Sequence, residues 1–420
     1  MNFSQLLQSF SCACGKEHSC EIEQIVIRPG ALDALPALVE QEREILLVAD
    51  TNTYAACGAQ VVMGLQGKCV RTQIFDCEGF LIPNEDAIFG VRQKLTDRTS
   101  LILGVGSGVI QDLCKYVSFF AGLPYIIVAT APSMDGYASK GAAMILDNMK
   151  VTVTAHVPKA IIGDVDVLKQ APMDMIRSGY GDILGKFSCL NDWKLGQLVL
   201  DEYFCQYVYD MTWDMLQCTK DLGFQLQQRD PDAVQTLMEA LIGIGIAMAY
   251  VGNSRPGSGS EHHLSHFFEI TGILNAEPYL VHGTDVAYSA VATQRLREEL
   301  LMLDSPKSAG AITREAWEAK IRELYTKAAD GVIALQDKLG WYQTDRVTRY
   351  AERWAEIRQV LQEPPEVSSM EDYLTSVGFD PAAFEELYGA EKIRDAVLFA
   401  KDLKDRYSVL WMYYDLLSDR

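Results

Sequence analysis

Short apolar runs alternate with longer segments of helical spacing up to about residue 130. Uninterrupted runs, such as residues 45–49 and 125–129, are typical of strands that a parallel sheet buries on both faces. The alternation therefore predicts an α/β fold, a Rossmann-like domain built on a parallel sheet. The predicted strands are residues 22–28, 45–49, 70–75, 101–103, 125–129 and 160–163, and the predicted helices are residues 30–40, 83–98 with Asn84 as N-cap, and 109–121.

The pattern changes after about residue 140. Residues 141–146 and 151–155 flank an Asp-Asn pair and predict a β-hairpin. Helical spacing then dominates from residue 173 to the end. Because 420 residues exceed what a single core usually serves, we expect an α/β domain over residues 1–168 and an all-helical domain over residues 169–420. The clearest helical stretches are residues 233–251, 312–339, 344–361 and 391–417.

Two glycine-bearing segments stand out in the helical half. Gly243 and Gly245 interrupt an apolar helix, and such glycines are expected where two helices pack closely. Residues 255–260, RPGSGS, have the composition of a flexible loop.

The predicted strand at residues 101–103 breaks at once into the glycine-rich turn GVGSG, residues 104–108. The next strand ends in a loop with Thr130 and Ser133. Two such loops at the carboxyl ends of parallel strands form a crevice, and a glycine turn at a helix N-terminus suits a pyrophosphate. The alternative is a turn without a ligand, because Val109 or Gln111 occupies the third glycine position of the GxGxxG dinucleotide motif.

Asp50 ends the apolar run of residues 45–49. In dinucleotide folds an acid at this place holds the adenosine ribose hydroxyls. Without a nearby Arg it favours NAD over NADP, although a cation from elsewhere could reverse this preference. The alternative is that Asp50 caps the helix that starts near Asn52.

Composition and net charge indicate which classes of molecule this protein can bind. Hydrophobic residues make up 49% and charged residues 22% of the chain, as in an ordinary globular protein. A formal charge of -20 argues against nucleic acids and anionic membranes, which need a basic face. The N-terminus lacks the basic region of a secretory signal, and the longest apolar run, residues 240–251, is too short for a bilayer. We therefore expect a cytoplasmic protein that binds a small molecule, with no membrane or nucleic-acid partner.

Most of the ten cysteines are scattered, which fits reduced thiols better than a disulfide framework. One group is denser, and its spacing could hold a zinc ion. The alternative is a free N-terminal segment at the surface. The group consists of Cys12, Cys14, His18 and Cys20.

Four of the six histidines lie within residues 262–282. His262 and His266 are four residues apart, so both project from one face of a helix. A further histidine, His282, and an acid from elsewhere would complete a metal site with an open position for substrate. Asp182 in the segment SGYGDILGKF is the candidate acid, and on a helix it shares a face with Lys186. A lone histidine is more often a packing residue, but this clustering favours a metal site.

Five segments in order resemble the sn-glycerol-1-phosphate dehydrogenases, a branch of the iron-containing alcohol dehydrogenase and dehydroquinate synthase-like superfamily. The segments are GVGSGVIQD, TAPSMDGYAS, GYGDILGK, SRPGSGSEHHLSH and VHGTDV. The resemblance covers residues 20–300, and the remaining C-terminal part matches only in being helical. It implies an N-terminal nucleotide-binding domain, a helical metal- and substrate-binding domain, an active site in the cleft between them, and a homodimer.

The resemblance also implies roles for single residues. Asp182, His262 and His282 would be the metal ligands. His266 and Asp135 would lie near the substrate. His263 has no family role. Asp50 would take the ribose hydroxyls, and the other cofactor-binding residues would be Gly106, Ser107, Gly108, Asp112, Thr130, Ser133 and Ser139.

The implied reaction is the reversible reduction of dihydroxyacetone phosphate to sn-glycerol 1-phosphate by NADH or NADPH. One divalent metal would polarise the C2 carbonyl, and His266, or a water relayed by Asp135, would supply the proton. Zinc is the default metal, while nickel and iron suit the same ligands. Arg255 and Lys186 are candidates for the phosphate, and the alternative is that each is a solvated or helix-pairing charge.

Three other functions remain open. A glycerol or polyol dehydrogenase would share the fold and metal site and would turn over unphosphorylated substrates. A dehydroquinate synthase-like cyclase would leave NAD unchanged after turnover, and in that family the metal-binding acid is usually Glu rather than the Asp182 found here. A nucleotide-binding sensor with a decayed site is disfavoured because the predicted site residues are all present.

Overall fold

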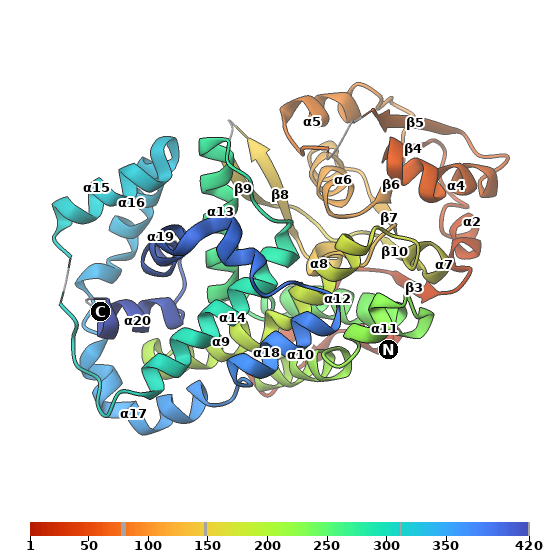
Figure 1. The fold of residues 1–420 in the computed structure, drawn as a ribbon. Coiled ribbons are helices and arrows are strands. Elements are labelled where there is room, and N and C mark those ends of the chain that lie inside the picture. Colours follow the sequence, from red (N-terminus) through yellow and green to blue (C-terminus); the bar gives the residue numbers. More distant parts are fainter. Residues whose placement is uncertain (77–80, 147–148, 311, 419–420) are drawn as a thin grey trace. The chain divides into compact units, whose positions relative to one another are not determined.

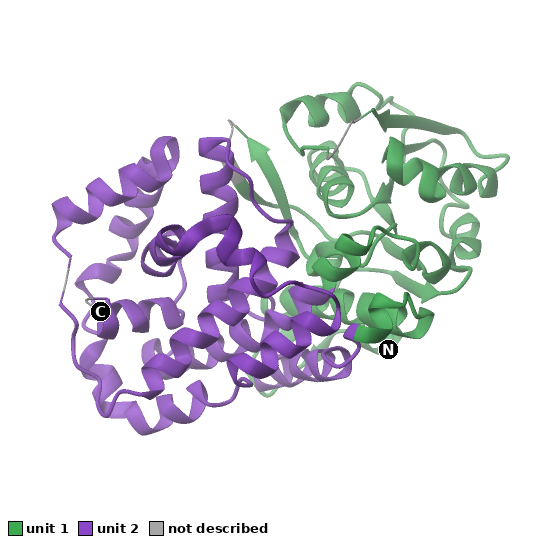
Figure 2. Ribbon diagram, in the orientation of Figure 1, with its two compact units in different colours: residues 1–179, 224–252 green, residues 180–223, 253–420 purple. Residues whose placement is uncertain are grey.

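A computed structural model describes residues 1–76, 81–146, 149–310 and 312–418 (Figure 1). The chain forms two compact units (Figure 2). Unit 1 comprises Met1–Gly179 and Phe224–Gly252, and unit 2 comprises Tyr180–Gly223 and Asn253–Arg420. These bounds differ from the predicted division at residue 168, chiefly because helix α12 (Pro231–Val251) packs against β3 (Gln24–Arg28) and α7 (Val165–Leu168) of unit 1.

Unit 1 is built on a six-stranded parallel sheet in the order β3-β10-β7-β6-β4-β5. The predicted strands and the α/β fold are therefore confirmed. The strand at residue 101 runs three residues further than predicted, because Gly104, Val105 and Gly106 still pair with the neighbouring strand β7. Besides β3, the strands are β4 (Ile45–Asp50), β5 (Val70–Phe75), β6 (Leu101–Gly106), β7 (Tyr125–Ala129) and β10 (Ala160–Asp164).

The direction in which the chain extends the sheet reverses between β4 and β6. From β4 the chain adds β5 on one side, and from β6 it adds β7 and then β10 on the other. Ligands of open parallel sheets bind at the carboxyl ends of the strands beside such a reversal. The loops after β4, β6 and β7 lie at this edge.

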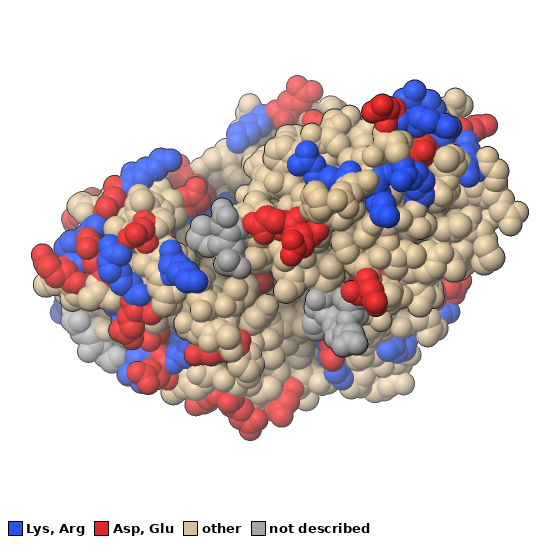
Figure 3. All heavy atoms as spheres, turned by 90° about the horizontal axis from the view of Figure 1, so that it is seen from above, with Lys and Arg blue, Asp and Glu red and all other residues tan. Residues whose placement is uncertain are grey.

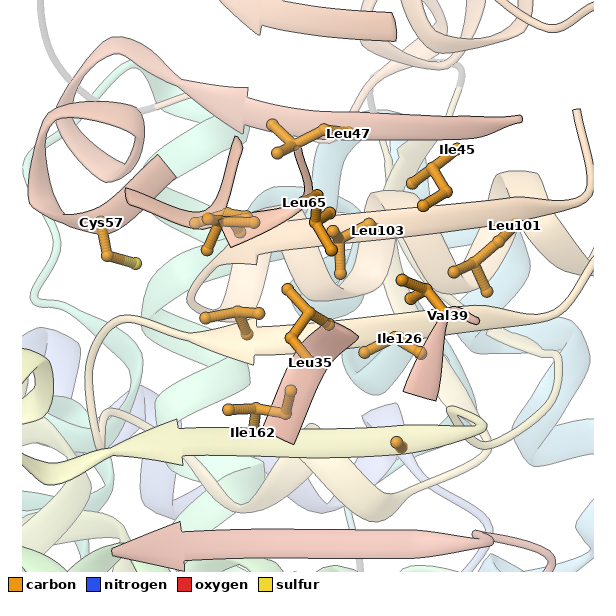
Figure 4. Packing of buried hydrophobic residues seen from close by; sticks show 14 of the residues in the cluster. Leu35, Val39, Ile45, Leu47, Cys57, Leu65, Leu101, Leu103, Ile126 and Ile162 are labelled. Atoms are coloured by element: carbon orange, nitrogen blue, oxygen red, sulfur yellow. The ribbon is translucent and has the colours of Figure 1, made fainter. Parts of the chain in front are cut away.

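One face of the sheet is covered by η1 (Ala31–Ala34), α2 (Leu35–Leu38) and α4 (Ala59–Gly64) (Figure 4). In Figure 4, Leu35 and Leu65 lie among side chains of four neighbouring strands. The predicted helix at residues 30–40 is instead η1 followed by one α turn. Pro36 lacks the amide hydrogen that a continuous α-helix would need there.

The other face carries α5 (Glu85–Arg92) and α6 (Gly108–Ala121). Asn84 is the N-cap of α5 as predicted, since its side chain accepts a hydrogen bond from Ala87 N at 3.1 Å. A Cβ atom on Gly106 would lie 2.5 Å from Cβ of Ile110. Glycine at this position therefore lets α6 pack directly against β6.

Helix α12 is long and apolar enough to cross a membrane by length and composition, but 78% of its most apolar window is buried. A Cβ atom on Gly245 would lie 2.8 Å from the carbonyl oxygen of Asp135. The close contact predicted here is therefore with the short turn η3 (Asp135–Ala138) rather than with a second helix.

Two antiparallel hairpins complete the strands of unit 1. Strands β8 (Gly141–Leu146) and β9 (Met149–Thr154) form the predicted hairpin, whose turn residues 147 and 148 lie outside the described residues. Strands β1 (Phe10–Ser11) and β2 (Glu17–His18) form a second hairpin that was not predicted. The remaining short elements are α1 (Phe3–Leu6), α3 (Thr51–Thr53), η2 (Tyr54–Gly58), α7 and α11 (Gly223–Gln227).

Among the described residues from Met173 onward, every element is helical, as predicted. The core of unit 2 joins α9, α14, α17 and α20. The predicted stretch 312–339 is interrupted where Thr326 adopts a left-handed φ of 40°. The helices are α8 (Met173–Leu184), α9 (Lys186–Leu200), α10 (Gln206–Thr219), α13 (Ser260–Asn275), α14 (His282–Leu301), α15 (Arg314–Tyr325), η4 (Thr326–Ala328), α16 (Ala329–Leu339), η5 (Trp341–Gln343), α17 (Val347–Leu361), α18 (Val367–Ser376), α19 (Ala383–Phe399), η6 (Ala400–Leu403) and α20 (Val409–Leu417).

Charged side chains of both signs lie on the face shown in Figure 3. The formal charge of -20 is therefore not displayed there as a continuous acidic surface.

Candidate functional site

Asp182, His262 and His282 come together in unit 2. Asp182 lies in α8, His262 in the first turn of α13, and His282 is the first residue of α14. The three ligand atoms all lie within 4.8 Å of one another. His262 Nε2 is 3.7 Å from Asp182 Oδ1, and the His262 and His282 ring centroids are 5.1 Å apart. Two imidazoles and a carboxylate suit a divalent transition metal with an open coordination position.

Glycine brings α8 and α14 close enough to form this cluster. A Cβ atom on Gly181 would lie 2.4 Å from the carbonyl oxygen of Gly283 and 2.7 Å from Cβ of Ala287. Only glycine permits this approach, and the neighbouring residues Asp182 and His282 meet as a result.

Glu261 orients the first histidine. Its Oε1 atom lies 2.7 Å from His262 Nδ1 and accepts a hydrogen bond from Gly259 N at 2.8 Å. A carboxylate on Nδ1 leaves Nε2 to face Asp182, which is the usual support of a metal-binding histidine. Sequence reasoning missed Glu261, although an acid directly before the paired histidines was the available signal.

The protonation states of the cluster suit metal binding. Burial acts to raise the pKa of Asp182, but the charges of Lys186 and His262 outweigh it and lower this pKa to about 2. Burial, with the charge of Lys186, holds the pKa of His262 well below its ordinary value. A carboxylate and a neutral imidazole are the forms that ligate a metal.

Lys186 is fully buried, and its Nζ lies 2.8 Å from Asp182 Oδ1 and donates to the carbonyl oxygen of Gly257 at 2.8 Å. This pair confirms that Asp182 and Lys186 share one face. The structure thus places Lys186 against the candidate metal ligand Asp182 as a pairing charge, rather than in an open phosphate site.

The other two histidines of α13 occupy different environments. The His266 ring lies 6.1 Å from that of His262 and 5.8 Å from that of His282, so it belongs to the same group. His263 is fully buried, and burial together with the charge of Arg406 holds its pKa well below the ordinary value. Of the adjacent pair, His262 belongs to the candidate metal cluster and His263 does not.

A buried ion pair holds the start of α13. Asp192 accepts from Ser260 N at 2.6 Å and from Arg297 Nη2 at 2.9 Å. A Cβ atom on Gly259 would lie 2.6 Å from Cα of Cys189. Residues 255–260 are all buried, so their glycines serve close packing and the flexible-loop prediction was wrong.

Arg255 was predicted from the sequence as a candidate for binding the substrate phosphate, but in the structure its side chain makes internal contacts. It is buried, forms an ion pair with Glu202 at 2.5 Å, and donates to the carbonyl oxygen of Tyr407 at 2.7 Å. The structure therefore favours the pairing alternative for this residue.

Two cations that sequence reasoning did not consider lie near α13. The charge of Lys404 contributes to lowering the pKa of both His262 and His263. Arg406 Nη1 donates to Ser254 Oγ at 2.9 Å and to the carbonyl oxygen of Ser258 at 3.2 Å. Both residues belong to unit 2, as do the residues of the candidate metal cluster.

The predicted cofactor residues share the carboxyl edge of the sheet in unit 1. Gly106, Ser107 and Gly108 form the turn from β6 into α6, and Thr130 follows β7. Thr130 N donates to the carbonyl oxygen of Gly106 at 3.1 Å, so the two loops are directly linked. The helix N-terminus beside them carries the partial positive charge that favours a phosphate.

Lys115 organises the loop that carries the other predicted residues. It is fully buried and donates to the carbonyl oxygens of Gly136 at 3.1 Å and Gly141 at 2.7 Å. Its Nζ also lies 3.4 Å from Asp112 Oδ1 and 3.4 Å from Ser139 Oγ. Asp112 and Ser139 are thus held by one cation, which sequence reasoning missed because Lys115 stands in a largely apolar helix.

Asp135 and Ser133 lie in the same loop of unit 1. Asp135 is buried and begins η3. Ser133 accepts a hydrogen bond at its carbonyl oxygen from Ser178 Oγ at 3.0 Å. A Cβ atom on Gly179 would lie 1.8 Å from the carbonyl oxygen of Pro132, so glycine allows α8 to approach this loop.

Asp50 acts as a helix cap. Its Oδ1 accepts from Thr53 N at 2.8 Å, and Thr53 Oγ1 accepts from Asp50 N at 3.0 Å. The capping alternative is therefore realised, and a ribose hydroxyl would have to be taken by Oδ2.

A family model described as iron-containing alcohol dehydrogenase matches residues 26–172. The glycerol-1-phosphate dehydrogenase (NAD(P)+) of Halalkalibacterium halodurans is 34% identical over 297 residues, which is 68% of this chain and 73% of the relative. The enzyme of the same name from Geobacillus stearothermophilus is 33% identical over 329 residues, which is 74% of this chain and 81% of the relative.

Solved structures share the fold. The alcohol dehydrogenase from Oenococcus oeni matches with a TM-score of 0.61 at 14% identity, over 93% of this chain and 94% of that chain. This likeness agrees with a parallel sheet flanked by helices and a mostly helical C-terminal half.

Proposed function

Because the chain belongs to the glycerol-1-phosphate dehydrogenase family, we propose that it catalyses the reversible reduction of dihydroxyacetone phosphate to sn-glycerol 1-phosphate with NADH or NADPH. The observation that carries this proposal beyond the family relationship is the cluster of Asp182, His262 and His282, with Glu261 behind it. This is a complete set of protein ligands for a metal with an open position.

Asp182, His262 and His282 would hold the metal, which supplies Lewis-acid polarisation of the C2 carbonyl. Zinc is the default for such a redox-inert role, and nickel and iron fit the same ligands. Glu261 keeps Nε2 of His262 directed at Asp182. Lys186 keeps Asp182 ionised in spite of its burial.

The product alkoxide needs a proton at the C2 oxygen, and we assign its delivery to His266. Its ring lies 6.1 Å from that of His262 and is only partly buried, so it can exchange a proton with solvent. The role of Asp135 in unit 1 as a proton relay stays a prediction.

The dinucleotide would bind at the carboxyl edge of the sheet in unit 1. The turn GVGSG and the start of α6 would take the pyrophosphate, and Asp50 Oδ2 would take the ribose hydroxyls. Lys115 would position the loop beside them. The residues assigned to this site are Asp50, Gly106, Ser107, Gly108, Asp112, Thr130, Ser133 and Ser139.

We assign the substrate phosphate to Lys404 and Arg406. Lys404 lies near enough to His262 and His263 to influence the pKa of both, and Arg406 is bound to the loop before α13. Two cations near the metal cluster would attract a dianionic phosphate. Glycerol and dihydroxyacetone carry no phosphate, so these two cations would not strengthen their binding.

The protein would act in the cytoplasm as a homodimer on a small molecule. The charge of -20 speaks against nucleic acids and anionic membranes as partners.

The decisive assay is the loss of NADH absorbance with dihydroxyacetone phosphate, before and after chelation, followed by chiral analysis of the product. We expect metal-dependent oxidation and the sn-1 enantiomer. Oxidation with dihydroxyacetone but not with its phosphate would support a polyol dehydrogenase instead. Turnover of another substrate that leaves bound NAD unchanged would support a cyclase.

A further inference from the structure

The N-terminal hairpin of unit 1 gathers a second set of metal-binding side chains. Strands β1 and β2 pair with Phe10 opposite His18, and the turn between them carries Cys12 and Cys14. Cys12 N donates to the carbonyl oxygen of Lys16, and Gly15 N donates to that of Cys12, each at 3.0 Å. The turn closes because Gly15 adopts a φ of 85°, which favours glycine. This segment is an ordered hairpin rather than a free surface tail.

The ligand atoms of Cys12, Cys14 and His18 all lie within 4.8 Å of one another. Cys14 Sγ and His18 Nε2 are 3.4 Å apart. Zinc bonds of about 2.3 Å to sulfur and about 2.05 Å to nitrogen, arranged tetrahedrally, separate such atoms by about 3.5 Å. The pair is therefore already spaced as it would be around a zinc ion.

His18 is held with one ring nitrogen directed at the thiols. It is fully buried, and its Nδ1 lies 2.9 Å from the carbonyl oxygen of Tyr250 in α12. A carbonyl partner requires the hydrogen on Nδ1, which leaves the lone pair of Nε2 on the side of Cys14. The ring also stacks on Tyr250 at 5.4 Å and meets the edge of Phe10 at 5.4 Å. A backbone partner on the far nitrogen is typical of metal-binding histidines.

We propose that Cys12, Cys14 and His18 bind a structural zinc ion that fastens the N-terminal hairpin to α12. Two thiolates neutralise the charge of Zn²⁺, which suits a largely buried site, and binding releases the thiol protons. A fourth ligand comes from outside the hairpin. Cys20, the fourth ligand expected from the sequence, lies outside this group, two residues beyond the end of β2. Burial raises the pKa of its thiol.

This site differs in chemistry from the cluster of Asp182, His262 and His282. The catalytic cluster offers nitrogen and oxygen, whereas the hairpin offers two sulfurs and one nitrogen. Cobalt(II) bound by thiolates absorbs strongly in the near ultraviolet through charge transfer, and cobalt bound by nitrogen and oxygen does not. The two sites can therefore be told apart in one protein.

The test is a Co²⁺ titration of the metal-stripped full-length protein, followed by zinc analysis of the protein as purified. We expect a thiolate charge-transfer band that persists in His262→Ala and is lost in the double variant Cys12→Ser, Cys14→Ser. Zinc content should fall by about one ion per chain in the double variant. The exposed Cys218 provides the matched control, since Cys218→Ser should leave the band intact.

A second variant separates the loss of a ligand from the loss of the fold. Cys14→His keeps a zinc ligand, so zinc content should be retained while the charge-transfer band weakens. The absence of the band from the wild-type protein, or its persistence in the double variant, would overturn the proposal. Single replacements of the remaining cysteines, Cys20 and Cys205 among them, then identify the fourth ligand.

Discussion

Glu261 shows how one buried carboxylate can orient a residue of the candidate metal cluster. It is buried, and its Oε1 lies 2.7 Å from His262 Nδ1. We predict that Glu261→Gln lowers metal affinity and kcat/KM by about 10–100-fold, because the amide no longer holds the imidazole in the required tautomer and orientation. Metal competition with a chromophoric chelator and NADH oxidation measure the two effects. The exposed Glu315→Gln is the matched control, and unchanged metal affinity in Glu261→Gln would contradict the assignment.

Lys404 tests the assignment of the phosphate. We expect Lys404→Ala to raise KM for dihydroxyacetone phosphate by about tenfold, since the loss of one charge-assisted contact costs about 1.4 kcal/mol. Turnover of dihydroxyacetone should change little, because that substrate has no phosphate. Lys404→Arg keeps the charge and should restore most of the affinity. Equal losses with both substrates would place Lys404 elsewhere in the mechanism.

His156 in unit 1 links stability to pH. Its Nε2 lies 2.7 Å from Ser118 Oγ, and burial, followed by the charge of Lys115, lowers its pKa in the folded protein. The unfolded chain, with a pKa of about 6.5, then binds more protons. This contribution to stability is complete above about pH 6.5 and is lost as the pH falls below that value.

We therefore predict that His156→Gln flattens the decline in stability between about pH 6.5 and 5.5. Denaturant midpoints of the wild-type protein and of His156→Gln are measured across this pH range. Their difference isolates His156, because the other titrating groups contribute equally in both proteins. Values at pH 7.5 serve as the reference. Parallel pH profiles would show that His156 does not contribute.

At the scale of elements, glycines set how closely helices approach their neighbours. Gly106 brings α6 onto β6, Gly181 brings α8 onto α14, and Gly245 brings α12 onto η3. In each case an added Cβ would lie within 2.8 Å of a neighbouring atom. The candidate site residues stand directly beside these contacts, so packing distance and function are coupled.

We predict that Gly106→Ala lowers the free energy of unfolding by about 1–3 kcal/mol, because its Cβ would overlap Ile110. NADH affinity should fall as well, since the turn before α6 would shift. Thermal unfolding and fluorescence titration measure both. Gly64→Ala in α4 is the matched control, because an added Cβ there meets no atom within 4 Å and should be neutral or slightly stabilising. If Gly106→Ala had the same free energy of unfolding as the wild-type protein, glycine would not be required for α6 to pack against β6.

At the scale of the whole molecule, the proposed sites fall in different units. The residues assigned to the dinucleotide belong to unit 1, and the candidate metal ligands belong to unit 2. Each unit has its own hydrophobic core. The proposed reaction would use both sets of residues, because hydride would pass from the dinucleotide to the C2 carbonyl of the substrate.

We expect NADH binding to survive His262→Ala, with a Kd within about threefold of the wild-type value, while turnover with dihydroxyacetone phosphate is abolished. Isothermal titration calorimetry measures the first quantity and NADH oxidation the second. Thr130→Val, which alters only unit 1, is the complementary variant. Loss of NADH binding in a folded His262→Ala protein would show that this division is wrong.

The sequence by itself determined the parts of the structure that depend on short-range order. The strands, the hairpin at residues 141–154, the Asn84 cap and the helical second half follow from local periodicity and capping. The pairing of His262 with His266 was visible for the same reason, since a four-residue spacing places side chains on one helix face. His282 begins a different helix, α14, and tertiary packing brings it to them.

Only the tertiary structure decided which partners distant groups take. Spacing cannot distinguish His262 from its neighbour His263. It predicts that Asp182 and Lys186 share a face, but it does not show that this pair is buried or that Arg255 pairs with Glu202. Nor does composition show that residues 255–260 are buried, or that Cys20 lies outside the hairpin cluster. These outcomes depend on which elements pack together and which charges lose their water, and neither quantity is encoded in the pattern of a single segment.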